Sequence, residues 1–561
     1  MPIMDIALEL KEVNYRYPDN EKYVLKDINL KISRGLFYIL TGPTGSGKTT
    51  LLMLARGFYK EYGGAFNGDI HIFGQNIKNF DIGELGSKIG IIFQNPATQL
   101  HQLRVIDEIM SSPIYQGFPW NECKARAETI INELLDKNIY YRAPNELSSG
   151  EQQKVALAAC LAMECEILLL DEPFSFLDAK STKEILNILL KLKREGKTII
   201  LSTHSLEEVS GYADRIALIN SGKLISEGTT EEILYSNELK EILTSPLSIK
   251  FAKALIRKRK LKKRVVNWQN LLKKIKIKSK IGEMIENNTK QGSILKFDNI
   301  SYTYPGGTKG VKNISLDIYK GEILGIVGIN ASGKTTLAKL ALGLLKPNKG
   351  RIYLLDEDIT KLDVSERAKN IGYVTQDPTE MLFEDTVLEE CAFGPKCLRL
   401  ENPKQLAKET LNKLGLLRYK EEYPDSLSGG EKRLLTIADI LVNRPQVLIL
   451  DEPEFGLDPK IFRSITCIIK KLKKEGKTII LITHNLESTI FLCDRVAVMN
   501  KGRILKVKDP IRLYKDPEFL QKSNLSSLPL FKTLKALGKN RKPLSEEKFI
   551  DFLTASAEEI K

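Results

Sequence analysis

Long hydrophobic runs are missing from this sequence. No apolar stretch approaches the ~18–20 residues that a helix needs to span a bilayer. The longest apolar runs, such as Ile167 to Leu170, are typical of buried parallel strands. The N-terminal stretch MPIMDIALEL has acidic residues where a secretory signal would need basic ones. We therefore expect a cytosolic chain, so any path through a membrane would come from other subunits.

Cysteine and histidine are also scarce, with seven and four residues among 561. The cysteines form no CxxC pair, and the closest two are Cys160 and Cys165, so we do not expect a zinc or iron–sulfur site. Reduced thiols, buried or at the surface, are the simpler interpretation. The apolar content of 42% and the charged content of 28% are ordinary for a globular protein. The length predicts about three to five domains.

Acidic residues are absent from one stretch. Between Phe251 and Lys280 there are 13 Lys or Arg and no Asp or Glu, which accounts for nearly all of the net charge of +14. The favoured interpretation is a solvated helix with apolar residues on its other side. The alternative is contact with nucleic acid, lipid headgroups or an acidic partner.

The chain contains an internal repeat, because the sequence motifs of the first half recur in the same order in the second. A glycine-rich loop occurs twice, as GPTGSGKT from Gly42 to Thr49 and as GINASGKT from Gly328 to Thr335. Three further pairs share one constant separation along the chain: Ser148 and Ser428, Asp171 and Asp451, His204 and His484. A repeat that spans half the chain indicates a duplicated domain rather than a solenoid.

Each half alternates predicted strands and helices. A first strand-like stretch ends in a tyrosine pair, a second strand leads into the glycine-rich loop, and a helix follows. Further buried strands end at Asp171 or Asp451 and in TIILSTH or TIILITH. This alternation predicts a parallel sheet with its site at the carboxyl ends of the strands. The predicted ranges are 37–40 and 323–327 for the strands before the loops, and 50–56 and 336–342 for the helices after them.

The glycine-rich loops predict phosphate binding. In G-x-x-x-x-G-K-[ST], the backbone curls around phosphates at a helix N-terminus, where partial positive charge gathers. Lys48 and Lys334 would reach the β- and γ-phosphates, and Thr49 and Thr335 would ligate Mg²⁺. The two matches, each in register with further landmarks, make a chance occurrence negligible.

Carboxylates and histidines at the ends of later strands predict hydrolysis. Asp171 and Asp451 would hold the Mg²⁺ shell, and the glutamate after each would polarise the attacking water. A lone histidine after a strand is more often a structural cap. Because each histidine follows its aspartate at the same spacing in both halves, we favour a contact with the γ-phosphate. The predicted catalytic residues are Glu172, His204, Glu452 and His484.

A second helix start in each half completes the pattern. LSSGE (Leu147 to Glu151) and LSGGE (Leu427 to Glu431) open helices, although each half already has a phosphate loop for its own nucleotide. With these segments, the chain resembles the ABC ATPase family over nearly its whole length. The resemblance implies an α/β fold with two P-loop nucleotide-binding domains in tandem. Each domain would have an antiparallel β subdomain, a helical subdomain and a short helical C-terminal appendage.

The resemblance further implies a head-to-tail pair with two ATP molecules between the halves. The first site would combine Lys48, Gln94, Asp171, Glu172 and His204 with Ser428 and Gly430. The second would combine Lys334, Gln376, Asp451, Glu452 and His484 with Ser148 and Gly150. The expected division is 1–235 for the first ATPase domain, 236–292 for a helical appendage and basic linker, 293–510 for the second ATPase domain and 511–561 for a second appendage.

The family motifs assign a set of residues to ATP, with Tyr17 and Tyr304 matching an adenine-stacking aromatic and Asp178 and Asp458 matching the D-loop. In the first half these are Tyr17, Gly42, Pro43, Thr44, Gly45, Ser46, Gly47, Lys48, Thr49, Thr50, Gln94, Ser148, Gly150 and Asp178. In the second half they are Tyr304, Gly328, Ile329, Asn330, Ala331, Ser332, Gly333, Lys334, Thr335, Thr336, Gln376, Ser428, Gly430 and Asp458. The expected Mg²⁺ shell is Thr49, Gln94 and Asp171 in one half, and Thr335, Gln376 and Asp451 in the other.

One position departs from the family pattern. Ser149 stands where glycine is usual, and a serine with positive φ would cost roughly 1 kcal/mol. We therefore expect two competent sites with mild asymmetry.

Gln94 and Gln376 match the glutamine of the family's Q-loop. The sequences that follow them indicate a particular type of ABC ATPase. FQNPATQLHQLRVIDEI and TQDPTEMLFEDTVLEECAFGP are similar to the ATPases of energy-coupling-factor importers, which take up vitamins or transition-metal ions. The first half departs at His101, where phenylalanine is usual, and lacks FGP. The resemblance implies a transmembrane coupling subunit and a small membrane substrate-binding subunit as partners, at the cytoplasmic face of the cell membrane. The alternative is a soluble tandem ABC ATPase of translation, which the basic stretch favours and the DEPFSFLD and DEPEFGLD texts oppose.

Overall fold

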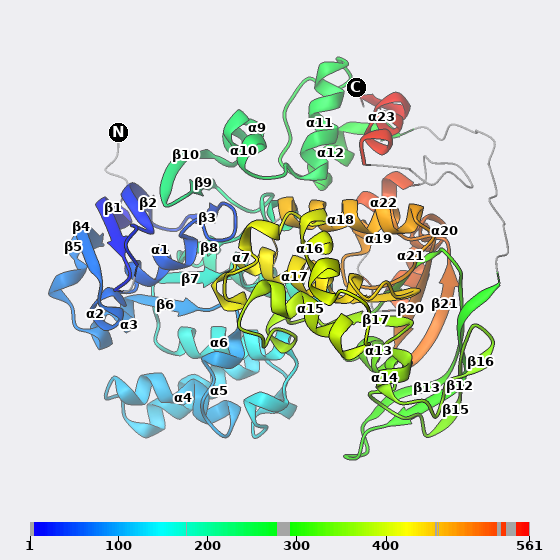
Figure 1. Ribbon diagram of the computed structural model, residues 1–561. Helices are drawn as coiled ribbons and strands as arrows, with labels where there is room; N and C mark the ends of the chain where they lie inside the picture. The colour runs from blue at the N-terminus through cyan, green and yellow to red at the C-terminus, as the bar shows by residue number, and fades with distance from the viewer. Residues whose placement is uncertain are drawn as a thin grey trace. The chain divides into compact units, whose positions relative to one another are not determined.

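The computed structural model describes residues 5–18, 20–175, 177–277, 292–454, 457, 459–523, 525, 529–534 and 546–559. The chain divides into two compact units, Met1–Lys274 and Ile275–Lys561, and each contains one copy of the repeat (Figure 1). This confirms the predicted α/β fold with two domains in tandem. The expected four-part division is finer and stays a prediction.

The N-terminal part of the first unit forms an antiparallel sheet. Its order is β2-β1-β4-β5, formed by Leu25–Ser33, Ile6–Arg16, Ala65–Ile72 and Gln75–Asn76. Strand β2 alternates along its length, so that Leu25, Ile28, Leu30 and Ile32 face the core while the residues between them are more exposed.

A six-stranded sheet forms the centre of this unit, in the order β10-β9-β3-β8-β7-β6. The strands in this order are Lys223–Thr229, Arg215–Asn220, Phe37–Thr41, Thr198–Ser202, Ile167–Asp171 and Ile89–Ile92. All neighbours are parallel except β9 and β10. Every residue of β3, β7 and β8 is buried, as expected for parallel strands covered on both faces.

Three helices of the first unit gather into a subdomain with its own apolar core. Helices α4 (Val105–Tyr115), α5 (Trp120–Leu134) and α6 (Ser149–Ala162) pack around Ile109 and Ala127 (Figure 1). The other helices are α1 (Lys48–Ala55), α2 (Tyr59–Tyr62), α3 (Ile82–Lys88), α7 (Ala179–Arg194), α8 (Leu206–Val209), α9 (Thr230–Tyr235) and α10 (Asn237–Ile242), with short 3-10 turns η1 (Ile77–Asn79), η2 (Pro96–Thr98), η3 (Lys137–Ile139) and η4 (Pro144–Glu146).

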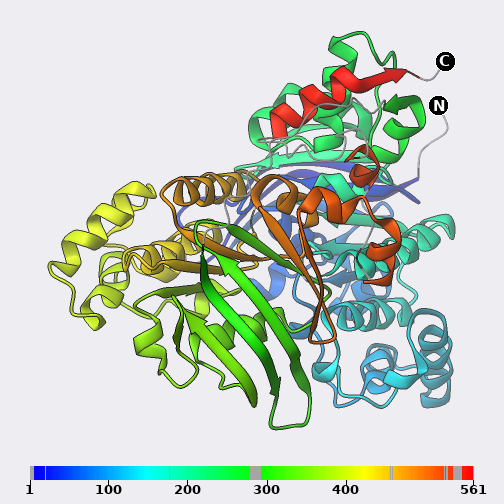
Figure 2. The ribbon, with the colours of Figure 1, turned by 90° about the vertical axis from the view of Figure 1, so that its right-hand side faces the viewer.

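The second unit repeats both sheets. Its antiparallel sheet, green in Figure 2, has the order β13-β12-β15-β16, formed by Lys309–Tyr319, Ser293–Thr303, Lys349–Leu354 and Glu357–Asp358. Its six-stranded sheet has the order β17-β18-β19-β14-β20-β21, formed by Ile371–Val374, Val447–Asp451, Thr478–Ile482, Ile323–Val327, Arg495–Asn500 and Arg503–Lys508.

The helices of the second unit follow the same plan. Helices α15 (Val387–Cys397), α16 (Pro403–Lys413) and α17 (Gly429–Leu441) share an apolar core and form the helical subdomain. The others are α13 (Lys334–Leu342), α14 (Val364–Arg367), α18 (Pro459–Lys474) and α19 (Leu486–Leu492), with turns η5 (Pro378–Glu380), η6 (Leu417–Tyr419) and η7 (Pro424–Ser426).

Both predicted appendages contain helices. The first unit ends in α11 (Leu247–Arg257) and α12 (Trp268–Lys274), and the second in α20 (Pro510–Tyr514), α21 (Pro517–Lys522), α22 (Pro529–Leu534) and α23 (Glu546–Ser556). Within the second unit, β11 (Ile275–Ile277) pairs antiparallel with β22 (Ala557–Glu559).

The basic stretch has one apolar side, as predicted. Phe251, Leu255 and Leu261 are buried, whereas the charged residues between 257 and 259 are exposed. The last part of the stretch, 278–280, lies outside the described residues. Within the described part of the chain, no helix is both long and apolar enough to cross a membrane.

Candidate functional site

Each glycine-rich loop turns directly from a buried strand into a helix. Gly47 and Gly333 precede helices α1 and α13 with φ of 102° and 100°. A Cβ atom on Gly47 would lie 2.7 Å from a methyl group of Leu25, so backbone freedom and close packing both favour glycine here. Both helices begin at the lysine, slightly earlier than the sequence indicated, which places the lysine in the first turn.

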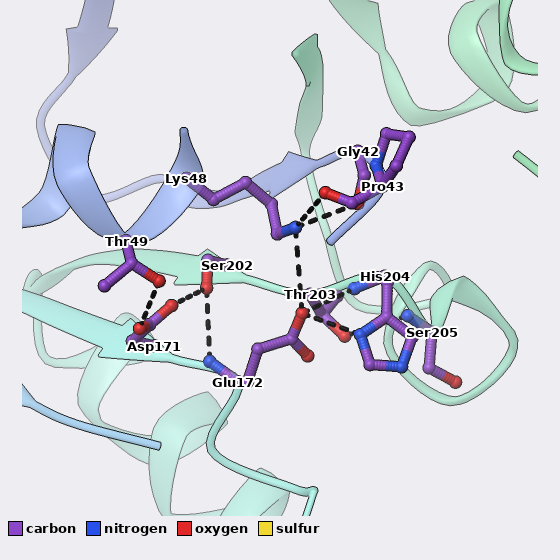
Figure 3. A network of polar contacts seen from close by, with 10 residues as sticks. All are labelled: Gly42, Pro43, Lys48, Thr49, Asp171, Glu172, Ser202, Thr203, His204 and Ser205. Atoms are coloured by element: carbon purple, nitrogen blue, oxygen red, sulfur yellow. Dashed lines mark hydrogen bonds and ion pairs between the residues drawn. The ribbon is translucent and has the colours of Figure 1, made fainter. Parts of the chain in front are cut away.

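The lysine of each loop points back over the loop. In the first unit, Lys48 Nζ donates to the carbonyl oxygens of Gly42 and Pro43 at 2.9 Å, and lies 4.0 Å from Oε1 of Glu172 (Figure 3). In the second unit, Lys334 Nζ donates to the carbonyls of Gly328 and Ile329 at 3.0 and 3.1 Å. The fold of the first unit thus brings the loop lysine and the predicted hydrolytic glutamate to one place.

The loops fit a phosphate group. The hydroxyl oxygens of Ser46 and Ser332 are buried and have no hydrogen-bond partner among the described residues. Each serine belongs to a loop that leads into a helix beginning at the loop lysine, where backbone N–H groups point outward. An oxyanion at this position would satisfy these donors together.

Asp171 and Thr49 supply hard oxygen ligands. The Thr49 hydroxyl donates to Oδ2 of Asp171 at 2.6 Å, and the Ser202 hydroxyl donates to Oδ1 at 2.5 Å (Figure 3). Burial raises the pKa of Asp171, although both hydroxyls oppose that effect. A hydroxyl beside a carboxylate at the carboxyl end of a parallel strand fits Mg²⁺, which prefers such ligands.

In the second unit, the aspartate that corresponds to Asp171 has a different hydrogen-bond partner. The Tyr373 hydroxyl donates to Oδ2 of Asp451 at 3.1 Å, and burial raises the pKa of Asp451 while the side chain of Thr335 opposes the rise. Ile482 stands in register with Asp451, as Ser202 does with Asp171. Sequence reasoning missed Ser202 and Tyr373, because only the strand register shows that they reach the aspartate.

Glutamate and histidine meet in both units. Glu172 Oε1 lies 2.8 Å from Nδ1 of His204 and accepts a second hydrogen bond, at 3.0 Å, from the His204 backbone N–H. His484 Nδ1 lies 3.5 Å from Oε2 of Glu452. Glu172 and Glu452 have positive φ, 44° and 46°, a conformation that is uncommon for residues other than glycine and often marks functional sites.

The second pair, Glu452 and His484, is charged. Burial acts against the charged form of His484, but Glu452 outweighs it and raises the pKa of His484 to about 9. Burial likewise acts to raise the pKa of Glu452, but the bond to His484 lowers it. At neutral pH the two groups therefore form an ion pair.

The two Q-loop glutamines differ. Gln376 Nε2 donates to Oε2 of Glu452 at 3.0 Å. Among the described residues, the Gln94 side chain forms no corresponding bond with Glu172. Tyr17 and Tyr304 bond through their hydroxyls to Thr50 and Thr336, at 3.1 and 3.0 Å, which fixes each ring beside its phosphate loop.

The helices opened by LSSGE and LSGGE start with capping boxes. Ser148 and Glu151 bond reciprocally at the start of α6, and Ser428 and Glu431 do so at the start of α17. Asp178 caps α7 by accepting a hydrogen bond from the Ser181 backbone at 2.8 Å. Asp458 lies outside the described residues. The predicted completion of each site by the other half stays a prediction.

The expected cost at Ser149 is wrong. Neither Ser149 nor Gly429 has positive φ, because both occupy the first position of an ordinary α-helix. A Cβ atom on Gly429 would meet nothing within 4 Å. The next residue is the constrained one, since a Cβ on Gly430 would lie 2.1 Å from Cδ1 of Ile461. Serine at position 149 therefore causes no backbone strain.

Comparison with known proteins agrees with this geometry. A family model described as ABC transporter matches residues 25–175 and 311–454. A protein of Methanosarcina mazei, provisionally named an ABC transporter ATP-binding protein, is 33% identical over 543 residues, covering 93% of this chain and 92% of that protein. A protein of Caldanaerobacter subterraneus with the same type of name is 31% identical over 560 residues, covering 96% and 98%.

A solved structure of CbiO1 from Clostridium perfringens, described as part of the ABC transporter complex CbiONQ, is 34% identical with a TM-score of 0.38, covering 44% of this chain and 99% of that one.

The chain belongs to the ABC transporter family. It is an ATP-binding subunit with two ABC ATPase domains, and ATP hydrolysis by this family is coupled to transport. The relatives named above are ATP-binding proteins of transporters, so they give no support to the alternative of a translation ATPase.

Proposed function

We propose that this chain powers an importer of the energy-coupling-factor type, which takes up a vitamin, a vitamin precursor or a transition-metal ion. In this proposal the chain binds the cytoplasmic face of the membrane through a transmembrane coupling subunit, beside a small substrate-binding membrane subunit. The main support for the proposal is the structure of two loops, 94–104 and 376–386. Each begins at a Q-loop glutamine and leads into the helical subdomain of its half. We call them the docking loops.

A buried glutamate accepts hydrogen bonds from the backbone of each docking loop. Glu390 Oε2 accepts hydrogen bonds from the backbone N–H groups of Phe383 and Glu384, at 2.7 and 2.8 Å. Glu108 Oε2 accepts the equivalent bonds from His101 and Gln102, both at 2.8 Å. These bonds fix the backbone of each loop while side chains such as His101, Leu103 and Phe383 remain exposed, as a rigid docking surface requires.

The second docking loop presents aromatic rings to solvent. Phe383 is 62% exposed, and its ring meets Phe393 of the FGP text edge-on, with centroids 4.8 Å apart. A soluble surface seldom exposes such a pair without a partner, and an amphipathic helix of a membrane subunit would bury both rings. In the first half, the exposed apolar residue of the loop is Leu103, so the two docking surfaces differ.

The site residues define the chemistry that drives transport. Lys48 and the loop N–H groups would bind the phosphates, and Thr49 and Asp171 would hold Mg²⁺, which supplies charge neutralisation when bound. Glu172 would accept a proton from the attacking water, with His204 fixing the orientation of its carboxylate. Lys334, Thr335, Asp451, Glu452 and His484 would have the same roles in the second half. ATP then changes the conformation only through its different affinities for two arrangements of the halves.

Co-purification from detergent-solubilised membranes tests this proposal. We expect the wild-type chain to retain a polytopic membrane protein, and Phe383→Asp to lose it, with about 2 kcal/mol or roughly thirtyfold in affinity at stake for a central aromatic. Leu505→Asp is the matched control, because Leu505 is 44% exposed on β21 of the same unit, outside the helical subdomain. The proposal fails if both variants retain the same partners. It also fails if the chain instead sediments with ribosomes in a salt-dependent manner, which would favour a translation ATPase.

A further inference from the structure

Arg433 connects two functional segments of the second unit. It lies on α17, one helical turn after Gly430, and its side chain is fully buried. Its Nη1 atom donates to the carbonyl oxygen of Thr375 at 2.5 Å, and its Nη2 atom donates to the carbonyl oxygen of Gln376. The helix that begins with LSGGE is therefore bonded to the backbone of the Q-loop in its own half.

The Q-loop continues this connection to the catalytic carboxylate. The Gln376 side chain donates to Glu452 at 3.0 Å, while its carbonyl group accepts from Arg433. One residue thus contacts the hydrolytic glutamate on one side and the buried arginine on the other. A rotation of α17 relative to the sheet would pull on the hydrogen bond that orients Glu452.

Glu454 belongs to the acidic surroundings of Arg433, although burial raises the pKa of its own carboxyl group. Burial lowers the pKa of Arg433 to about 10, and of the carboxylates that oppose this effect Glu454 acts most strongly. The Thr483 hydroxyl donates to Oε1 of Glu454, and its Oε2 atom is buried without a hydrogen-bond partner among the described residues. Arg433 therefore stays protonated at neutral pH within an acidic environment that includes Glu452.

The first unit has neither charge. The repeat places Gln153 at the position of Arg433 and Phe174 at that of Glu454, in the same register that aligns Asp171 with Asp451. The Gln153 side-chain nitrogen is buried without a partner among the described residues, and Phe174 packs against the apolar core. Two ionisable side chains in the second half thus correspond to a neutral amide and a phenyl ring in the first.

We propose that Arg433 is a positioning residue that couples the Q-loop of the second half to the helix beginning at Ser428. Through this helix, ATP binding at the second nucleotide site would affect ATP binding at the first. The first half has no matching connection among its described residues, so the coupling depends on this one connection in the second half. This inference rests on the proposed pairing of two nucleotide sites, but not on the identity of the membrane partner.

A substitution that copies the first half provides the test. Arg433→Gln alone would remove a positive charge from the acidic surroundings that include Glu454, whereas Arg433→Gln/Glu454→Phe reproduces both residues of the first half. The coupling factor between the sites is measured as the change in ATP affinity of the first site when the second is filled. We expect a wild-type factor of at least about fivefold, falling to about one in the double variant. Turnover at saturating ATP should change less than the coupling factor.

Two controls separate coupling from general damage. Gln153→Ala removes the side chain at the same register of the first half and should leave the coupling factor unchanged. Arg433→Lys keeps the charge but loses the two hydrogen bonds of the guanidinium group. This variant should therefore retain only part of the wild-type coupling factor. A wild-type factor of one, an unchanged factor in a folded double variant, or an equal loss in Gln153→Ala would each overturn the inference. Failure to find a membrane partner would instead count against the proposed function alone.

Discussion

Nδ1 of His204 lies 2.8 Å from Oε1 of Glu172, and the same oxygen accepts a bond from the His204 backbone. The carboxylate is therefore held in one orientation, with its second oxygen available to a water molecule. The corresponding atoms of His484 and Glu452 are 3.5 Å apart, and Gln376 shares the Glu452 carboxylate. The two glutamates predicted to hydrolyse ATP thus face the same type of neighbour at different distances. From this difference we predict two active sites with unequal rates.

Substitution of one glutamate at a time tests whether both sites hydrolyse ATP. A positioned general base contributes about 10²–10⁴-fold to rate, so Glu172→Gln or Glu452→Gln should nearly silence its own site. If both sites are competent, each single variant retains part of the wild-type turnover, and the double variant retains almost none. Steady-state phosphate release at saturating ATP measures this.

Equal ATP binding by all three variants is the control for intact folding. The interpretation of two competent sites is wrong if one single variant abolishes all turnover while the other is silent.

The ion pair in the second site predicts an unusual histidine titration. The pKa of His484 is raised to about 9 by Glu452, and the chain has only four histidines, which makes their NMR resonances tractable. We expect one histidine resonance of the nucleotide-free protein to titrate near pH 9 and to disappear in His484→Gln. In Glu452→Gln the same resonance should titrate at lower pH, because its charged partner is gone.

The stability of the protein should follow the same titration. A pKa raised above the unfolded value of about 6.5 means that the folded state binds the proton more tightly. The stabilisation is complete below about pH 6.5 and is lost as the pH rises through about 9. The thermal midpoint of wild type relative to His484→Gln should therefore fall over this interval. A difference that is constant between pH 6 and pH 10 would contradict the ion pair.

Gly150 and Gly430 should both be sensitive to substitution by a larger residue, whereas a change at Ser149 should have little effect. Gly430→Ala places a Cβ atom 2.1 Å from Ile461, and Gly150→Ala places one 2.6 Å from the Ser181 hydroxyl. Overpacking of this kind costs about 1–3 kcal/mol. Ser149→Gly is the control and should change the free energy of unfolding by less than about 1 kcal/mol, since helix-start positions tolerate glycine. Chemical denaturation measures all three, and an equal effect of all three would contradict the geometry described here.

The repeat made much of the fold predictable. Strands such as Phe37–Thr41 and the ends at Asp171 and Asp451 follow from apolar runs bounded by loop chemistry, and these were predicted correctly. The roles of Ser202 and Tyr373 were not predictable, because each reaches its aspartate from a neighbouring strand whose register no local pattern specifies. The assumption about Ser149 failed for a similar reason. A family pattern states which residue is usual, but only the backbone shows whether its φ is required.

The second appendage should stabilise the second ATPase domain through an aromatic stack. Phe531 of α22 lies parallel to Tyr514 of α20, with ring centroids 4.5 Å apart, and the Tyr514 hydroxyl bonds to Thr489 of α19 at 2.6 Å. Phe531 is almost fully buried, so Phe531→Ala should cost about 3–5 kcal/mol through lost contacts and a cavity. At this domain size, the loss lowers the thermal midpoint by roughly 10 °C.

Both tryptophans of the chain, Trp120 and Trp268, lie in the first unit. Tryptophan fluorescence therefore follows the first unit, and calorimetry follows both. We expect Phe531→Ala to lower a calorimetric transition while the fluorescence transition stays in place. Phe519→Ala is the matched control, because Phe519 is only partly buried on the neighbouring helix α21, and its loss should cost less. If Phe531→Ala shifts only the fluorescence transition, the stack does not stabilise the second domain.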